Sequence, residues 1–171
     1  LRMGREIGAD TLNLELATTY PNGVEVQPGR SIDTTGSSSF AVKKNAIFVD
    51  ATGKRVINEN ASLAALAQAT LKAPGHLLYL VMDKQGYDTY VKKAIDDHTF
   101  TSPAVFESWK TLINNGRPAH CEGTLEACAK TMGINPKGLL AQVAQWNSEV
   151  KAGKDTQFGR TNLHAIGEGP Y

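Results

Sequence analysis

The chain has 171 residues, of which 18 are basic and 17 acidic, and 41% are hydrophobic. This length suffices for one domain with its own core. A net charge of +1 argues against a nucleic-acid binder, which usually carries a basic excess. The longest apolar run, residues 77–82, is too short to span a bilayer. We therefore expect neither a nucleic-acid partner nor a membrane segment.

The first 44 residues predict a helix end, two short strands and a long polar segment. Residues 1–8 have the pattern of a helix that ends at a glycine. Residues 11–20 alternate leucines with polar residues, which is typical of a half-buried strand, and residues 24–27 form a second strand after a Pro-Asn-Gly turn. Residues 28–44 are rich in glycine and serine without a period, which predicts a loop that is either flexible or functional.

The middle of the chain predicts a hairpin, a helix and a strand. Residues 46–51 form a strand, and a Thr-Gly turn leads into residues 54–58, so the two form a hairpin. From residue 61 to 71 the apolar residues follow a helical period until Pro74-Gly75 ends the helix. Residues 76–83 are mostly apolar, and we expect this strand at the centre of the sheet.

The second half of the chain predicts four helices, three of them with recognisable N-terminal caps. They cover residues 86–97, 102–116, 123–133 and 135–153. Ser102, Thr124 and Asn135 are the predicted caps. The last helix should bury Leu139, Leu140, Val143, Trp146 and Val150. The order of elements predicts an α+β fold, with a small mixed or antiparallel sheet and helices gathered in the C-terminal half.

Few residues suggest chemistry by themselves. Cys121 and Cys128 have neither a zinc spacing nor that of a secreted disulfide framework, so we expect two buried or half-buried thiols in a reducing compartment. The histidines lack i,i+4 pairing, so no metal site is expected. No glycine-rich dinucleotide fingerprint, phosphate-binding loop or nucleophile elbow is present. From these residues alone we assign neither a nucleotide site nor a hydrolase triad.

Two longer stretches carry a family resemblance. They are "IFVDATGKRVINE", residues 47–59, and residues 124–160, followed by a closing "GEGPY". Together they resemble the fumarate reductase and succinate dehydrogenase type of FAD-dependent flavoprotein, in particular the branch with soluble fumarate reductases, urocanate reductases and 3-oxosteroid dehydrogenases. The matching residues are Gly53, Lys54, Arg55, Asn58, Glu59, Leu125, Gly133, Ile134, Pro136, Leu139 or Leu140, Val143, Trp146, Asn147, Gly153, Lys154, Asp155, Phe158 and Arg160.

The resemblance implies a domain organisation. In such flavoproteins the FAD domain is discontinuous and a capping domain is inserted between its halves. Residues 1–171 resemble that insert alone, a single capping domain excised from a larger two-domain flavoprotein. The FAD would be bound by the FAD-binding domain of the same polypeptide, not by this fragment, which would be inactive alone. The insert would close the substrate cleft while reduced flavin transfers hydride to an activated C=C bond of a small-molecule substrate.

The sequence departs from the family pattern at the residues that would touch substrate. The family's proton-donor arginine, four residues after the motif glutamate, corresponds to Leu63. The family's His-Pro pair is matched by Tyr20-Pro21, and its dicarboxylate-binding segment falls in residues 37–42, which hold no acid or base. Because leucine cannot bind a carboxylate as an arginine fork does, a less anionic substrate fits better than fumarate. The catalytic acid stays unassigned, with Tyr20 as a weak candidate.

Several roles stay open at this point. Candidate substrate-binding residues are Ser37, Ser38, Ser39, Asn58 and Glu59. The serines also fit a solvated loop, and Asn58 and Glu59 fit polar groups at the start of the next helix. Tyr20 also fits a core ring.

Arg55 fits a structural residue of the hairpin, and Asp155 and Arg160 fit residues that hold the C-terminal loop to the FAD half or to each other. The alternatives for function are the cap of a 3-oxosteroid-dehydrogenase-like flavoenzyme and a non-catalytic binding domain.

Overall fold

The computed structural model describes residues 2–12, 23–27, 30–33, 45–96, 102–113 and 120–171. Its helices are α1 (Arg2–Glu6), α3 (Leu63–Lys72), α4 (Lys84–Asp96), α5 (Pro103–Ile113), α6 (Leu125–Met132) and α7 (Pro136–Lys151), with a short 3₁₀ helix η1 (Pro74–His76). Tyr20, Ser37, Ser38 and Ser39 lie outside these ranges. Of the strand predicted at residues 11–20, only residues 11 and 12 lie within them. Among the helices in the described ranges, none is long and apolar enough to cross a membrane.

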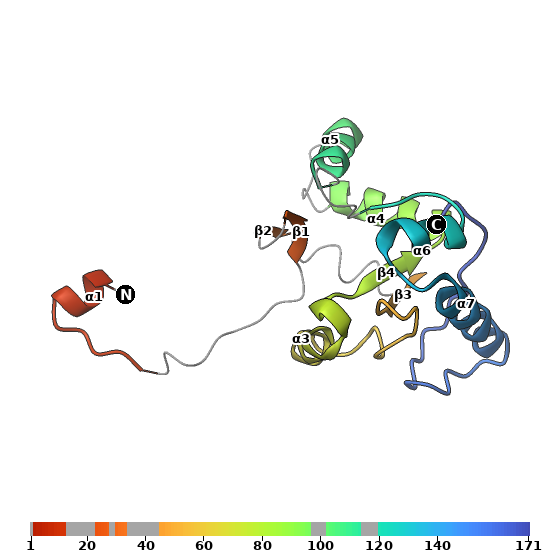
Figure 1. Cartoon of the computed structure of the whole chain (residues 1–171), viewed down its shortest axis with the longest axis horizontal. Helices are drawn as coiled ribbons and strands as arrows, with labels where there is room; N and C mark the ends of the chain where they lie inside the picture. Colours follow the sequence, from red (N-terminus) through yellow and green to blue (C-terminus); the bar gives the residue numbers. More distant parts are fainter. Residues whose placement is uncertain (1, 13–22, 28–29, 34–44, 97–101, 114–119) are drawn as a thin grey trace.

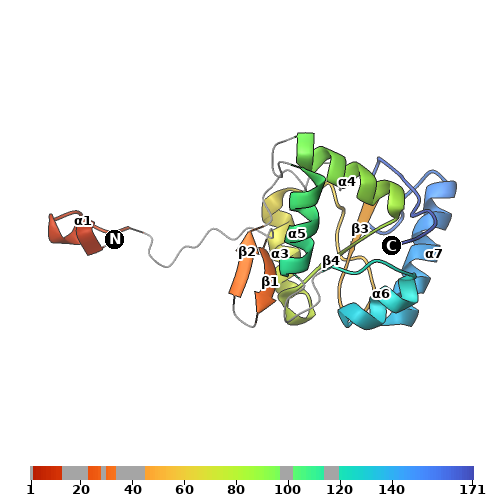
Figure 2. The same ribbon diagram turned by 90° about the horizontal axis from the view of Figure 1, so that it is seen from above.

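The described strands form two antiparallel pairs. β1 (Gly23–Gln27) pairs with β2 (Arg30–Asp33), and β3 (Ala46–Val49) pairs with β4 (Tyr79–Met82). In both views α6 and α7 lie on one side of the β3–β4 pair and α3 on the other (Figures 1 and 2). Helix α5 lies beside β1 and α4, and α1 lies apart from the other elements. The predicted α+β class with small antiparallel sheets and several helices is confirmed.

The core forms between the inner face of β3–β4 and the helix pair α6–α7. Strand alternation turns Ile47, Val49 and Val81 inward, where they meet buried residues of the two helices. The helix contribution comes from Leu125, Ala129, Leu139, Val143 and Trp146. Leu140 is 43% exposed, so the prediction that it is buried is wrong. It follows Leu139 by one position, and neighbouring residues of a helix point about 100° apart.

The turn after β3 touches the first turn of α7 backbone to backbone. A Cβ atom added to Gly138 would lie 2.0 Å from the carbonyl oxygen of Thr52. Gly53 has φ of 79° and an added Cβ would lie 2.3 Å from the backbone nitrogen of Leu139. Asn135 also donates its backbone N–H to the oxygen of Ala51 at 2.9 Å. Only glycine fits at both contact positions, and this fixes the turn against the helix.

Three sequence predictions about strands are corrected. Residues 54–58 form no strand, because only an isolated bridge joins Arg55 to Val49. Residues 30–33, predicted as loop, form β2. Among the described strands β4 pairs with β3 alone, and Leu80 is 37% exposed while Val81 is buried. This alternation belongs to a strand buried on one face, so the expected central position of β4 is wrong.

The predicted helix caps are confirmed. The side-chain oxygens of Thr124 and Asn135 accept backbone N–H groups at 3.1 and 3.0 Å, and Ser102 accepts one at 3.3 Å. Helix α6 ends at Gly133 in the left-handed conformation, as its sequence predicts. Helix α3 is capped by Ser62, which accepts the N–H of Ala65 at 3.2 Å. Of the two polar residues expected at the start of this helix, Asn58 accepts the backbone N–H of Asn60 in the preceding turn at 2.9 Å, whereas Glu59 accepts an N–H of β3 instead.

Candidate functional site

Two pairs of opposite charges lie buried where the turn after β3 meets the C-terminal loop. We call Arg55, Glu59, Asp155 and Arg160 the Arg55 cluster; all four are at most 4% exposed. Arg55 forms a bidentate pair with Glu59, with Nε–Oε1 of 3.0 Å and Nη2–Oε2 of 2.8 Å. It forms a second with Asp155, with Nη1–Oδ1 and Nη2–Oδ2 both 3.1 Å. Two bidentate pairs on one guanidinium hold residues 100 positions apart in a fixed geometry.

Arg160 and Glu59 satisfy the outer edge of β3 in place of a third strand. Arg160 Nη1 donates to the carbonyl of Ala46 at 2.8 Å and to Glu59 Oε2 at 3.0 Å. The N–H of Phe48 donates to Glu59 Oε1 at 3.2 Å. Side chains of the cluster thus accept and donate the bonds that a neighbouring strand would supply. This explains why residues 54–58 need not form the expected second strand of a hairpin.

Aromatic rings enclose the arginines of the cluster. The guanidinium carbon of Arg55 lies 4.3 Å from the ring centroid of Trp146 and 5.2 Å from that of Phe158. The guanidinium carbon of Arg160 lies 5.1 Å from the Trp146 ring. Both distances to Trp146 fit cation–π contacts. The cluster is therefore the polar extension of the hydrophobic core, with Trp146 shared by both.

Burial and neighbouring charges raise the pKa of Arg55 and lower the pKa values of Asp155 and Arg160. Burial alone would lower the pKa of Arg55, but hydrogen bonds and charges from Glu59 and Asp155 raise it above its ordinary value. Burial would raise the pKa of Asp155, but the Arg55 guanidinium and the N–H groups of Arg160 and Phe158 hold it well below its usual range. Burial lowers the pKa of Arg160. Paired charges of this kind need both partners, since either alone would be buried without compensation.

Glutamine side chains complete the hydrogen bonding around the cluster. Gln142 Oε1 accepts the backbone N–H of Arg55 at 3.0 Å, and its Nε2 donates to Gln157 Oε1 at 2.8 Å. Gln142 is 4% exposed and sits on the inner face of α7 beside Val143. Sequence reasoning missed it. A polar residue on the apolar stripe of the predicted helix is the signal that could have found it.

Asn58 and its neighbours connect the cluster to the start of α3. Asn58 Nδ2 donates to the carbonyl of Phe158 at 3.2 Å, and its Oδ1 accepts the N–H of Asn60 at 2.9 Å. The N–H of Ala61 donates to the Asn58 carbonyl at 2.9 Å, and Ser62 then begins the helix. Leu63, half-buried, is the first helical residue. The geometry shows Asn58 and Glu59 engaged within the chain, and their contact with substrate stays a prediction.

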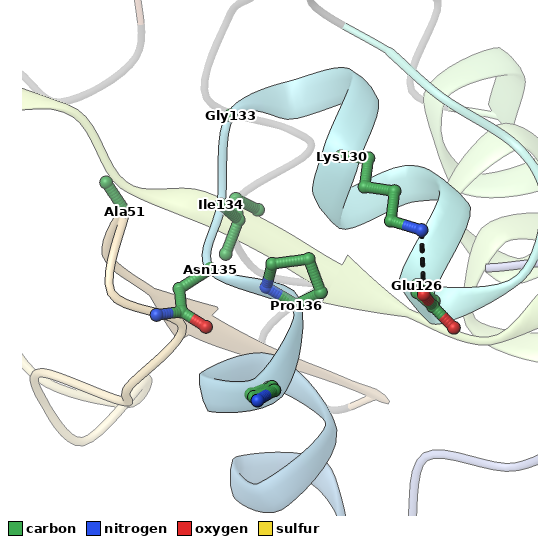
Figure 3. A pocket seen from close by; sticks show the side chains of 8 residues that line it. Ala51, Glu126, Lys130, Gly133, Ile134, Asn135 and Pro136 are labelled. Atoms are coloured by element: carbon green, nitrogen blue, oxygen red, sulfur yellow. Dashed lines mark hydrogen bonds and ion pairs between the residues drawn. The ribbon is translucent and has the colours of Figure 1, made fainter.

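An open depression lies at the junction of α6, α7 and the turn after β3 (Figure 3). Its lining includes Ile134, Pro136 and the exposed pair of Glu126 and Lys130, whose charged atoms are 2.7 Å apart. Asn135 Oδ1 at its edge already accepts an N–H of α7. None of the residues that the sequence suggested as catalytic or substrate-binding lines it. We assign it no role.

Comparison with known proteins shows relatives of one kind. No family model matches the chain. A fumarate reductase (cytochrome) of Shewanella frigidimarina is 31% identical over 150 residues, which are 86% of this chain and 23% of that protein. The digoxin reductase of Eggerthella lenta is 28% identical over 188 residues, covering 100% of this chain and 31% of that protein. The chain thus spans less than a third of these relatives.

A solved structure of similar size matches as well. The solution NMR structure of a fumarate reductase flavoprotein subunit from Lactobacillus plantarum superposes with a TM-score of 0.67 at 29% identity, covering 88% of each chain. The chain is therefore similar to one part of the fumarate reductase type of flavoprotein. Flavoproteins of this family are FAD-dependent oxidoreductases. The resemblance predicted from residues 47–59 and 124–160 is confirmed.

In this chain, four of the residues that carried the resemblance stabilise the fold. The Arg55 cluster consists of such residues. The side chains of Arg55, Glu59 and Asp155 have no exposed surface. The structural role predicted for Arg55 is confirmed. Asp155 and Arg160 hold the C-terminal loop to the turn after β3, and a backbone N–H of Arg160 donates to Asp155 at 3.0 Å. Both are buried, and this bond joins them to each other, which is one of the two roles that the sequence suggested.

The described residues do not fit an FAD site. Their sheets are antiparallel pairs, whereas a dinucleotide phosphate is commonly held at a helix that follows a strand of a parallel β-α-β unit. We derive no chemical step through FAD from these residues.

Proposed function

We propose that the chain is the capping domain of an FAD-dependent oxidoreductase, with the FAD-binding domain elsewhere in the same polypeptide. In this proposal the enzyme reduces an activated C=C bond, and the chain closes the substrate cleft and excludes water. Both named relatives are reductases, and each is several times longer than the matched segment, which supports an insert-like unit. Bound FAD would supply the hydride.

The observation that carries this proposal is the fixed relation between the Arg55 cluster and the start of α3. The buried pair of Arg55 and Glu59 and the bonds of Asn58 to the C-terminal loop determine where the helix begins. Leu63 then stands where the family resemblance expects a proton-donating arginine. A leucine supplies apolar surface and no positive charge. This supports a substrate less anionic than fumarate, and the match of this whole chain to 31% of a digoxin reductase is in keeping with an apolar substrate.

The proposal is tested with the full-length protein and with the isolated chain. The full-length protein, reduced under anaerobic conditions, should reoxidise its flavin faster with an uncharged enone than with fumarate. The isolated 171-residue chain should purify without flavin and show no turnover. A preference for fumarate would overturn the substrate class, and stoichiometric flavin in the isolated chain would overturn the separate FAD domain.

The apolar side chain of Leu63 also favours a second candidate function, that of a dehydrogenase. A 3-oxosteroid-dehydrogenase-like enzyme would oxidise an apolar ketone-containing substrate instead of reducing an enone. Assays of the full-length protein with saturated ketones and an artificial electron acceptor separate the two directions. A non-catalytic binding domain is the remaining alternative, and it predicts no turnover in either assay.

A further inference from the structure

Three successive residues of the turn before α3 bond to every second residue of the C-terminal loop. The pairs are Asn58 with Phe158, Glu59 with Arg160 and Asn60 with Asn162. We call these three contacts the α3 latch. The first two have donor–acceptor distances of 3.2 and 3.0 Å, and in the third Asn60 Nδ2 donates to Asn162 Oδ1. The latch therefore matches the turn to the loop residue by residue, just before the helix begins.

The third contact of the latch lies outside the buried charges. Asn60 is exposed and Asn162 is half-buried. Arg160 Nε donates to the backbone carbonyl of Asn162 at 2.9 Å and to its Oδ1 at 3.1 Å, so the Asn162 side chain is held with this oxygen toward Asn60. A neutral hydrogen bond at the surface contributes little to global stability. Loss of the Asn60–Asn162 bond should therefore leave the fold intact.

Helix α3 depends on this entrance for its direction. Two of its ten residues, Leu66 and Ala67, are buried. The cap Ser62 follows Asn60 by two positions, and Leu63 then begins the helix. A helix that buries so little surface is held loosely by packing, so the bonds at its start have a large share in fixing its first turn. A change in the latch should therefore move Leu63.

We propose that Asn60 and Asn162 are positioning residues that fix the place of Leu63 against the substrate. This inference rests on the function proposed above, in which Leu63 supplies apolar surface to the substrate cleft. The two asparagines act through the first turn of α3 and not by touching the substrate. With their bond in place, the apolar surface is held rigidly and selects substrates by shape. Without it, the first turn of α3 loosens and a bulkier substrate is accepted more readily.

Amide hydrogen exchange of the full-length protein tests whether the bond holds the helix. In Asn60→Ala and in Asn162→Ala, the amides of Ala65 and Leu66, which bond to the cap of α3, should exchange at least about threefold faster. Amides of α7 should keep their rates. Thr161→Ala, which shortens an exposed side chain of the same loop, is the matched control and should change neither helix. Unchanged exchange at the start of α3 in both asparagine variants would overturn the proposal.

Substrate selection by the full-length protein tests the positioning role itself. The measured quantity is the ratio of kcat/KM for a bulky enone to that for a compact enone. This ratio does not depend on the amount of folded enzyme, so a loss of stability alone cannot change it. Asn60→Ala and Asn162→Ala should each raise the ratio at least about threefold, and Thr161→Ala should leave it unchanged. The double variant should match Asn162→Ala, because both substitutions remove the same bond.

The outcomes distinguish this inference from the proposed function. If the unmodified full-length protein reduces neither enone, the proposed function is overturned, and the positioning role with it. If the unmodified protein reduces an enone and the active variants keep its ratio, the positioning role alone is overturned. Should Asn162→Ala fail to fold, Asn60→Ala at the exposed end of the bond decides between these outcomes.

Discussion

Arg55 and Glu59, four residues apart, form a bidentate ion pair in which neither side chain is exposed to solvent. The pair lies before α3, outside any helix, so it is not a surface i,i+4 contact of the usual kind. Asp155 and Arg160 from the C-terminal loop complete it. The residues that characterise the family in this chain thus stabilise a junction between distant segments.

Glu59→Gln should destabilise the chain strongly. The substitution removes one of two buried negative charges and leaves Arg55 and Arg160 to share Asp155. Breaking a buried pair in this way costs about 3–5 kcal/mol. Urea unfolding followed by circular dichroism measures the loss. Glu126→Gln, which removes an exposed partner of Lys130, is the matched control and should change the free energy of unfolding far less than Glu59→Gln. Similar losses in both variants would contradict a special role of the cluster.

Gly138→Ala should destabilise the chain although the position is helical. Alanine normally stabilises a helix interior relative to glycine by about 0.5–1 kcal/mol. Here its Cβ would meet the Thr52 oxygen at 2.0 Å, so the turn after β3 must move. We expect a net loss of about 1–3 kcal/mol in thermal or urea unfolding. A gain in stability would show that the turn and α7 are not in contact.

Acid should weaken the cluster through Asp155. The pKa of Asp155 is held below its usual value in the folded chain, against the opposing effect of burial, by Arg55 and backbone N–H groups. A carboxyl with a depressed folded pKa contributes stability that is complete above the unfolded pKa of about 4 and is lost as pH falls toward the folded value. Unfolding free energy measured from pH 6 to pH 2 should therefore fall below about pH 4. Asp155→Asn should be less stable at pH 7 and show a shallower acid dependence.

Leu63→Arg should change substrate preference in the full-length protein. It would restore a cation at the position where the family resemblance places the proton donor, and a guanidinium also attracts a dicarboxylate. We expect the ratio of fumarate to enone reduction, measured as kcat/KM, to rise at least about tenfold. Ala64→Arg, a cation at the next and exposed position, is the control and should leave the ratio unchanged. Equal effects of both variants would mean that Leu63 does not face the substrate.

Asp83→Ala should loosen the attachment of the C-terminal segment at Gly167 to the start of α4. The Asp83 carboxylate is 7% exposed and accepts the N–H of Gly86 in α4 at 2.8 Å and that of Gly167 at 2.6 Å. Its removal costs α4 a capping bond of about 1 kcal/mol and leaves Gly167 without this acceptor. Hydrogen exchange should become faster at Gly167 and Tyr171. Asp88→Ala, at an exposed partner of Lys84, should leave both amides unchanged.

The sequence by itself determined the local structure. The caps Ser102, Thr124 and Asn135, the glycine that ends α6 and the apolar period of α7 are local signals, because each depends on residues within one or two helical turns. Gly133 and the apolar residues of α7 also belong to the residues that carried the family resemblance. The class of the fold and the family could therefore be predicted before any contact was known.

The tertiary structure alone decided what those residues do. Sequence could not place Arg160 on the edge of β3, 114 positions from Ala46, or show that Glu59 replaces a strand instead of capping a helix. It could not show that the Thr52 carbonyl requires Gly138. Buried charges and close backbone contacts depend on partners far along the chain, and such partners leave no periodic signal in the sequence.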